Sequence, residues 1–220
     1  MEVKRLFDGV YSLDGKLATI NLVKGFKSYS EELYSKDGVE YRLWNPYRSK
    51  LSAALMNGMS NMHIKLGASV LYLGAATGTT ASHVSDIVSN EGEVYCVELS
   101  DRNMRKLVAV CEKRKNMLPI LADARFTDAY ARFVKDCDVV YQDVSSKEQA
   151  EILLSNSRFL KSGGFAYLAI KSQSIDISRS PEQIYQEVLE KLSGTFKVVE
   201  KVKLEPYDQL HLFVVLEKLQ

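Results

Sequence analysis

From residue 69 onward, short apolar runs alternate with amphipathic stretches. The runs SVLYL, EVYCVEL, MLPIL, CDVVYQDV and GGFAYLAIK are nearly continuous and rich in branched and aromatic side chains, as buried parallel strands are. The stretches between them, such as TTASHVSDIVS and SPEQIYQEVLEKLS, have the spacing of amphipathic helices. Repeated strand, helix, strand units predict an α/β fold, with a parallel sheet covered by helices on both faces.

The end of the chain departs from this alternation. The runs FKVVEKVKLE and LHLFVVLEK have no helix between them, so we expect them to form an antiparallel pair. Together, the five earlier runs and this pair predict a seven-stranded sheet with one antiparallel strand at or near its edge. Ser100 before Asp101 and Ser180 before Pro181 are predicted helix N-caps.

The first 48 residues have a different pattern. Asp14-Gly15 stands between two alternating runs, which is a strong hairpin signal, and GVEYRLWNP adds a further short strand. We therefore predict a small β-rich N-terminal domain over residues 1–48 and a main domain over residues 49–220. A helix from about Ser49 to Asn61 is expected to lead into the main domain.

The composition narrows the class of protein. Hydrophobic residues make up 46% of the chain and charged residues 26%, as in folded globular proteins. No apolar run approaches the roughly 18 residues that span a bilayer, and the first residues lack a secretory signal, so we expect a cytoplasmic protein without a membrane partner. The chain has three cysteines and three histidines without metal-ligand spacing, which predicts buried thiols and no metal site.

The charge is nearly balanced, with 29 basic and 28 acidic residues and a net charge of +1. This balance gives no global signature of independent nucleic-acid binding, so any contact with RNA would need help from other molecules. Six basic residues gather on one predicted helix, and we expect them to form an ordinary solvated face: Arg102, Arg105, Lys106, Lys113, Arg114 and Lys115.

The loop GAATG follows the first strand of the main domain, where open α/β sheets bind their ligands. A P-loop would need GxxxxGK[ST], but Gly74 and Gly78 are closer together and no lysine follows. A dinucleotide fingerprint would need GxGxxG, but Ala76 stands at its middle glycine. S-adenosylmethionine remains the best candidate ligand of this architecture, with its amino-acid part over the loop.

Polar residues also close the next two strands. Glu98 ends the second strand, where its carboxylate could accept both ribose hydroxyls, and Asp123 follows the third, where it could accept the adenine amino group. Taken singly, a GxxxG is often a tight turn and Glu98 could be a solvated or helix-capping carboxylate. The three features in order favour the cofactor interpretation.

Asp143 and Lys171 follow the fourth and fifth apolar runs and should emerge at the same edge of the sheet. A charged residue at the end of a buried strand is costly to desolvate unless it is paired, so both are candidates for chemistry. A simple ion pair between Asp143 and Lys171 that covers the end of the sheet is the alternative.

Several separated motifs closely resemble fibrillarin, the methyltransferase family of box C/D guide ribonucleoproteins: VLYLGAATGTTASHVSDIV, VYCVELSDRNMRKL, PILADAR, VVYQDV, AIKSQSID and YRLWNPYRSKLSAAL. The resemblance spans nearly the whole chain and is closest to the archaeal form, which lacks a glycine-arginine-rich tail. It implies a seven-stranded Rossmann-like methyltransferase fold that transfers methyl from S-adenosylmethionine to a ribose 2′-hydroxyl of rRNA or tRNA. It also implies partners: guide RNA, a Nop-domain scaffold protein and a kink-turn-binding protein that resembles a ribosomal protein.

The resemblance also carries residue roles. It implies a catalytic set of Lys50, Asp143, Lys171 and His211. The cofactor contacts that it and the loop position imply are Gly74, Ala75, Thr79, Thr80, Glu98, Leu99, Asp123, Ala124, Asp143, Val144, Ser145 and Ser146. On this basis Thr79 and Thr80 touch the methionine end, Glu98 and Leu99 the ribose, and Asp123 and Ala124 the adenine.

Two departures from the family pattern leave alternatives open. The family's EDVAQ is QDVSS here, which changes Gln142 and Ser146, and its Asp-His pair in the last hairpin is Leu210-His211. Without that aspartate, His211 is equally well interpreted as a core or edge-strand histidine. Lys171 could accept the hydroxyl proton or stabilise the developing alkoxide. A non-catalytic scaffold and a small-molecule methyltransferase are the competing functions.

Overall fold

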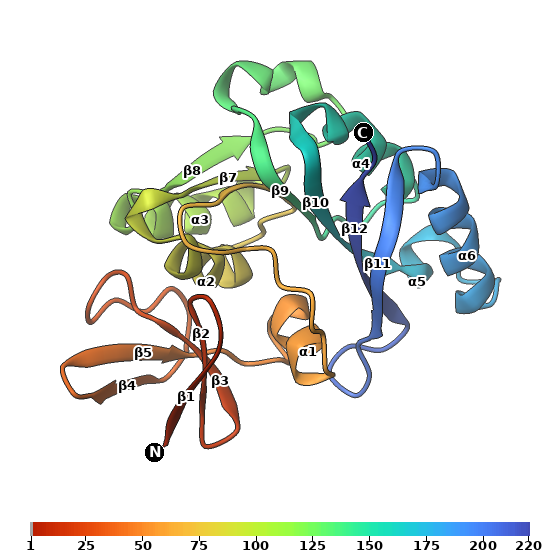
Figure 1. Cartoon of the computed structure of the whole chain (residues 1–220). Coiled ribbons are helices and arrows are strands. Elements are labelled where there is room, and N and C mark those ends of the chain that lie inside the picture. Colours follow the sequence, from red (N-terminus) through yellow and green to blue (C-terminus); the bar gives the residue numbers. More distant parts are fainter. Residues whose placement is uncertain (1) are drawn as a thin grey trace.

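The computed structural model describes residues 2–220 and contains two β-sheets, a five-stranded sheet at the N-terminus and a seven-stranded sheet beyond it (Figure 1). The larger sheet has the strand order β11-β12-β10-β9-β6-β7-β8. Its strands are β6 (Ser69–Leu73), β7 (Glu93–Glu98), β8 (Met117–Leu121), β9 (Cys137–Gln142), β10 (Leu160–Lys171), β11 (Phe196–Lys203) and β12 (His211–Lys218).

Six of these seven strands run in one direction, and β12 runs antiparallel to both of its neighbours, β10 and β11. The predicted seven-stranded sheet with one near-edge antiparallel strand is confirmed. The chain order reverses between β6 and β9, so their carboxyl ends flank the crevice in which sheets of this kind bind ligands.

Helices cover both faces of the large sheet (Figure 1). One face packs against α1 (Lys50–Met56), α2 (Thr79–Val88) and α3 (Asp101–Lys113), and the other against α4 (Gln149–Asn156), α5 (Ser172–Ile175) and α6 (Pro181–Leu192). Four short 3-10 turns complete the chain: η1 (Ser89–Glu91), η2 (Thr127–Ala129), η3 (Ala131–Phe133) and η4 (Ser157–Phe159). Ser100 and Ser180 cap α3 and α6 as predicted, each accepting a backbone N–H of the first turn.

The N-terminal sheet is built from β1 (Val3–Phe7), β2 (Val10–Leu13), β3 (Lys16–Ile20), β4 (Leu33–Lys36) and β5 (Val39–Leu43). Asp14-Gly15 forms the predicted hairpin turn, with both residues at positive φ. A second hairpin at Asp37-Gly38 has the same geometry and joins β4 to β5. The boundary of this domain at residue 48 stays our prediction.

A buried ionic network joins the N-terminal sheet to α2 and α3. Arg42 of β5 donates to Asp86 of α2 at 2.7 Å and to Glu31 at 2.6 Å. Arg114, at the end of α3, donates to the other oxygen of Asp86 at 2.6 Å. All four side chains are fully buried, and their two positive and two negative charges balance. Arg114 is thus not on the solvated face that the sequence predicted.

The helix that leads into the main domain is shorter than the predicted span of residues 49–61. Ser49 is its N-cap, but α1 ends at Met56 because Asn57 turns away and donates to the carbonyls of Lys203 and Glu205, and Gly58 follows at φ +93°. The three cysteines are free and buried, as predicted. Within residues 2–220, no helix has the length and apolar character to cross a membrane, and no cluster of side chains suits a metal ion.

Candidate active site

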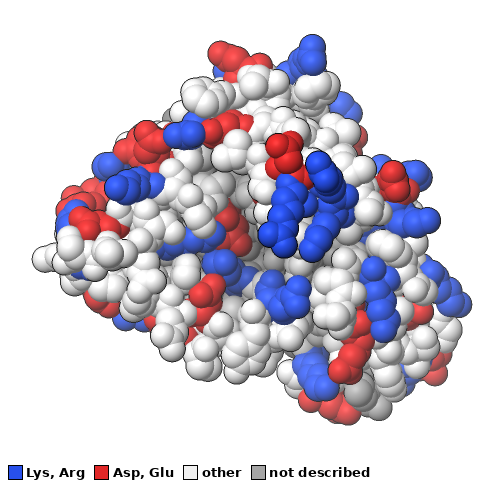
Figure 2. Space-filling view, turned by 180° about the vertical axis from the view of Figure 1, so that it is seen from behind, with Lys and Arg blue, Asp and Glu red and all other residues white. Residues whose placement is uncertain are grey.

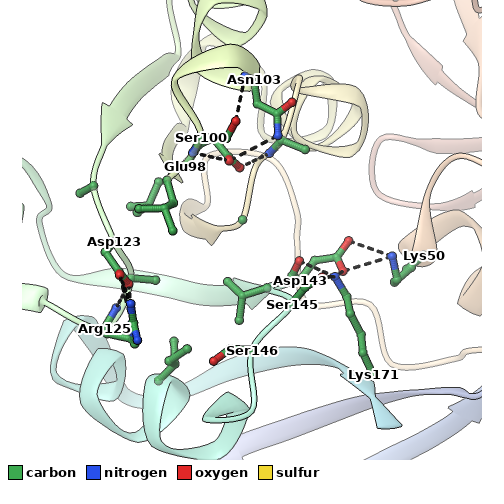
Figure 3. A pocket seen from close by; sticks show the side chains of 18 residues that line it. Lys50, Glu98, Ser100, Asn103, Asp123, Arg125, Asp143, Ser145, Ser146 and Lys171 are labelled. Carbon is green, nitrogen blue, oxygen red and sulfur yellow. Dashed lines mark hydrogen bonds and ion pairs between the residues drawn. The ribbon is translucent and has the colours of Figure 1, made fainter. Parts of the chain in front are cut away.

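A hollow of about 580 Å³ opens where the parallel strands end (Figure 3). The segments after β6, β7, β8 and β9 contribute to its wall, and so does Lys171, the last residue of β10. The lining residues include most of the predicted site: Lys50, Gly74, Glu98, Leu99, Asp123, Ala124, Asp143, Val144, Ser145, Ser146 and Lys171. Residues from distant parts of the sequence therefore meet at one edge of the sheet.

The glycine loop is fixed by its contact with the loop after β9. Gly74 has φ +80°, and a Cβ on it would lie 2.9 Å from the backbone oxygen of Asp143. Asp143 in turn donates its N–H to Leu73 O at 2.9 Å. A side chain at position 74 would push the two loops apart, so glycine is needed here both for φ and for space.

Glu98 holds the same loop from the other side. Its carboxylate accepts the backbone N–H of Ala76 at 2.8 Å and that of Ser100 at 2.8 Å, and Asn103 donates to it at 3.4 Å. Ala76 needs this anchor because it has φ +48° without being glycine. Glu98 therefore shapes the loop as well as facing the hollow, a role that its position in the sequence did not predict.

The far end of the hollow combines an apolar surface with a carboxylate. Leu99 is 62% exposed, and Ala122, Val144 and Ile152 line the hollow near it. Asp123 is held there by Arg125, whose guanidinium lies 2.6 Å from Oδ2, and this hydrogen bond lowers the pKa of Asp123. A flat heteroaromatic ring with an amino group would find here apolar walls for its faces and an acceptor for its N–H groups.

Three predicted cofactor residues do not line the hollow. Ala75 is buried, and Thr80 donates its hydroxyl to Ser49 Oγ at 3.0 Å, so that it ties α2 to the N-cap of α1. Thr79 is the first residue of α2 and lies outside the lining as well. Their predicted contact with the methionine end stays a prediction.

Asp143 lies between two lysines (Figure 3). Its Oδ1 is 2.8 Å from Lys171 Nζ and 3.2 Å from Lys50 Nζ. Lys171 also donates to the backbone oxygen of Asp143 at 2.8 Å and to Ser145 Oγ at 3.1 Å. All three side chains are less than one fifth exposed, so this cluster is partly desolvated and its charges interact strongly.

Both lysines of the cluster face oxygen atoms. Lys171 Nζ lies within 3.1 Å of three oxygen atoms, which are Asp143 Oδ1, Asp143 O and Ser145 Oγ. Burial alone would lower the pKa of Lys50, but the carboxylates of Asp143 and Asp208 outweigh burial and raise it. Lys50 is therefore suited to stabilise negative charge.

A second, smaller hollow of 270 Å³ shares Lys50 and Asp143 with the first. Its other lining residues are Pro46, Tyr47, Arg48, Ser49, Tyr207 and Asp208. Tyr47 is 67% exposed, and its ring lies edge-on to that of Tyr207 at 5.1 Å. Lys50 and Asp143 thus line both hollows, whereas Lys171 lines only the larger one.

His211 lies at the start of β12, directly opposite Lys171 in the antiparallel ladder. Opposite residues point to the same face of a sheet, so the two side chains are neighbours. His211 Nδ1 lies 3.0 Å from Asp208 Oδ1 and 2.7 Å from Gln209 O. Leu210 removes the adjacent aspartate of the family pattern, but Asp208 provides a carboxylate three residues earlier.

The residues that depart from the family pattern have structural partners. Gln142 is fully buried and donates to Gln149 O at 2.7 Å. Gln149 then connects the loop to β10: its Nε2 donates to Ser146 O at 2.9 Å, and its Oε1 accepts the N–H of Lys171 at 3.0 Å. Gln149 carried no motif signal, yet it fixes the distance between the loop after β9 and Lys171.

The strand order, the helices on both faces and the hollow at the switch point define the Rossmann-like methyltransferase fold. A sequence model of the family Fibrillarin matches residues 1–219. This chain belongs to the Fibrillarin family.

Individual family members match over their full length. The "Fibrillarin-like rRNA/tRNA 2'-O-methyltransferase" of Pyrococcus furiosus is 49% identical, covering 99% of this chain and 99% of that protein. Aeropyrum pernix fibrillarin, solved with natively bound S-adenosyl-L-methionine, superposes with a TM-score of 0.90 at 42% identity and covers 98% of both chains. The fibrillarin of a fibrillarin/Nop5p complex gives a TM-score of 0.89 at 39% identity, covering 98% of this chain and 100% of that one.

Proposed function

We propose that this chain is an RNA-guided ribose 2′-O-methyltransferase that acts on rRNA and tRNA in box C/D ribonucleoproteins with S-adenosylmethionine as the methyl donor. The observation that carries the proposal is the Lys50, Asp143 and Lys171 cluster, which lines a cofactor-sized hollow and, through Lys50 and Asp143, a second one. The name of the Pyrococcus furiosus relative supports the reaction and the substrates.

The residues of the larger hollow fit S-adenosylmethionine. Glu98 would accept the ribose hydroxyls with its free lone pairs, and Asp123 and Ala124 would meet the adenine beside the exposed Leu99. The loop from Gly74, with Ala75, Thr79 and Thr80, and the segment Val144, Ser145 and Ser146 would hold the methionine end. When bound, the cofactor supplies an electrophilic methyl group on a positively charged sulfur.

The acceptor ribose would approach through the smaller hollow. Arg48 at its rim suits a phosphate, and the exposed ring of Tyr47 suits stacking on a base. Lys50 and Lys171 then stabilise the negative charge that develops on the 2′-oxygen, with Asp143 fixing both ammonium groups. Most of the acceleration comes from holding the reactants in line, which can supply about 7–11 kcal/mol.

The partners of the proposal are a Nop-domain scaffold, a kink-turn-binding protein and the guide RNA with its target. The fibrillarin/Nop5p complex supports the scaffold. Lysine and arginine side chains border a central hollow on one face of the molecule, with acidic side chains among them (Figure 2). Such a mixed border agrees with a protein whose RNA binding is shared with its partners. A reaction on rRNA and tRNA agrees with a cytoplasmic location.

The test is methyl transfer from labelled cofactor to guide-matched RNA, with the complete complex and with the chain alone. We expect transfer only in the complete complex. Lys171→Ala should reduce it by about 10²–10³-fold while cofactor binding, measured by calorimetry, stays within a few fold. Lys161→Ala, an exposed lysine near the other end of the same strand, is the control.

Each contrary outcome identifies an alternative. Undiminished transfer by Lys171→Ala removes Lys171 from the catalytic set. Transfer by the chain alone to a small acceptor indicates a small-molecule methyltransferase. Absence of transfer in a correctly assembled complex that still binds the cofactor indicates a non-catalytic scaffold subunit.

A further inference from the structure

Asp208 is a third carboxylate beside the catalytic cluster, and no sequence motif pointed to it. It lies in the segment between β11 and β12, with its side chain one third exposed. Asp208 Oδ2 is 3.4 Å from Lys50 Nζ, and Asp208 Oδ1 is 3.0 Å from His211 Nδ1. One carboxylate thus joins two members of the proposed catalytic set that lie far apart in sequence.

We propose that Asp208 is a positioning residue for methyl transfer, which holds Lys50 and His211 in a fixed arrangement on the acceptor side of the cluster. The inference rests on the proposed function. Asp208 lines the smaller hollow and not the larger one, so its effect is directed at the acceptor rather than at the cofactor. It also accounts for the absence of an aspartate next to His211, because it brings a carboxylate to the same imidazole from three residues upstream.

The contacts of His211 assign its ring nitrogens. Gln209 O lies 2.7 Å from Nδ1 and, as a carbonyl, can only accept, so Nδ1 carries the proton. Asp208 Oδ1 is a second acceptor for the same N–H. In the neutral ring Nε2 then carries no proton and is a hydrogen-bond acceptor.

The segment that carries Asp208 is held at both ends. Tyr207 and Asp208 donate their backbone N–H groups to Leu204 O at 2.9 and 3.1 Å. Leu210 donates to the Glu205 carboxylate at 3.0 Å, and its carbonyl accepts the Ser172 hydroxyl at 2.9 Å. These bonds place the carboxylate before any substrate arrives, which is what a positioning role needs.

The first test compares Asp208→Asn and Asp208→Glu in the complete guide complex under single-turnover conditions. We expect Asp208→Asn to lower the transfer rate at least tenfold, with cofactor affinity and RNA half-saturation within about twofold, and Asp208→Glu to recover most of the rate. Asp128→Asn is the control, because Asp128 is an exposed aspartate paired with Arg158 outside both hollows. Transfer by Asp208→Asn within twofold of the wild type would overturn the proposal.

A double-mutant cycle with His211→Ala separates positioning from a general structural effect. If Asp208 acts through His211, the double variant loses little more than His211→Ala alone. If the rate losses of the two single variants multiply in the double variant, and Asp208→Asn also has a lower melting temperature and weaker cofactor binding, then Asp208 only supports the fold.

A third measurement does not depend on activity. The pKa of Lys50 is raised in part by Asp208, so Asp208→Asn should lower the pH at which Lys50 titrates. The titration can be followed by NMR of ¹³C-methylated lysines, and Asp128→Asn should leave it unchanged. If Asp208→Asn leaves the titration of Lys50 unchanged, the proposal is rejected even when the complex is inactive. If the titration changes but the wild-type complex does not transfer methyl groups, the proposed function is rejected instead.

Discussion

Asp143 and Lys171 are joined twice: Lys171 Nζ lies 2.8 Å from the Asp143 carboxylate and donates to the Asp143 backbone oxygen at 2.8 Å. The ammonium group of Lys171 is therefore fixed relative to both the side chain and the main chain of Asp143. The ion pair between them, which the sequence left as an alternative, is present, and its carboxylate is shared with Lys50 and lines the larger hollow.

Asp143→Asn keeps the shape of the side chain and removes its charge. Two ammonium groups then face a neutral amide, so the preorganised charge arrangement is lost. We expect single-turnover methyl transfer to fall by about 10²–10³-fold. Asp136→Asn, an exposed position just before the same strand, should not change the rate. Equal rates for the two variants would remove Asp143 from the catalytic set.

Gly74→Ala tests the close approach of the two loops. The new Cβ would lie 2.9 Å from Asp143 O, so we expect cofactor affinity to fall at least tenfold, as measured by calorimetry. Gly25→Ala is a matched control, because Gly25 has φ +76° against +80° for Gly74 but nothing within 4 Å of a Cβ. Both variants carry the strain of positive φ, about 1–2 kcal/mol, and only Gly74→Ala should also lose the cofactor.

Arg42→Met tests the buried network between the two sheets. It leaves Asp86 with one cation instead of two and Glu31 without its buried partner. We expect the free energy of unfolding to fall by about 3–5 kcal/mol in urea titrations. Arg102→Met on the exposed face of α3 should change it by about 0.5 kcal/mol at most. A small effect at position 42 would mean that water reaches the network.

His83 gives the fold a pH dependence near neutrality. Burial, and next the nearby Arg42 and Arg114, hold its pKa well below the usual value. The unfolded chain therefore binds a proton near pH 6.5 that the folded chain does not. The free energy of unfolding is consequently highest above that pH, as far as His83 is concerned, and decreases as the pH falls below it. The slope is at most about 1.4 kcal/mol per pH unit for this one group.

The measurement is urea unfolding at pH 7.0 and 5.5 for the wild type and His83→Gln. Part of the slope should persist in the variant, because burial also lowers the pKa of His63. Carboxylates whose pKa is lowered, such as Glu31, act below this window. An unchanged slope in His83→Gln would exclude His83 as its source.

The order and type of the main elements were predictable because each strand of the large sheet is a separate apolar run with its own turn signals. The carboxyl ends of parallel strands meet at one edge, so Glu98, Asp123, Asp143 and Lys171 could be placed together from the sequence alone. The β4 to β5 hairpin has at Asp37-Gly38 the same signal that identified the first hairpin, and our prediction missed it.

What the sequence did not predict depends on contacts between distant segments. The α1 helix ends early because the side chain of Asn57 finds carbonyl partners almost 150 residues away, at the last residue of β11 and just after it. Thr80 faces Ser49, and Gln149 bridges two strand ends, because of tertiary packing that no local pattern encodes. Asp208 stands at no familiar spacing from His211, and only the folding of the last hairpin brings its carboxylate to the imidazole.

The four-residue charge network also limits how this chain can be recombined. Glu31 and Arg42 come from the N-terminal segment, whereas Asp86 and Arg114 come from the main one, and the ion pair between Arg42 and Asp86 joins the two. A chimera that takes residues 1–48 from a relative would therefore keep the network only if the incoming segment carries an anion and a cation in the places of Glu31 and Arg42. Because the charges of the network balance, we expect substitutions at these four positions to occur jointly among related chains.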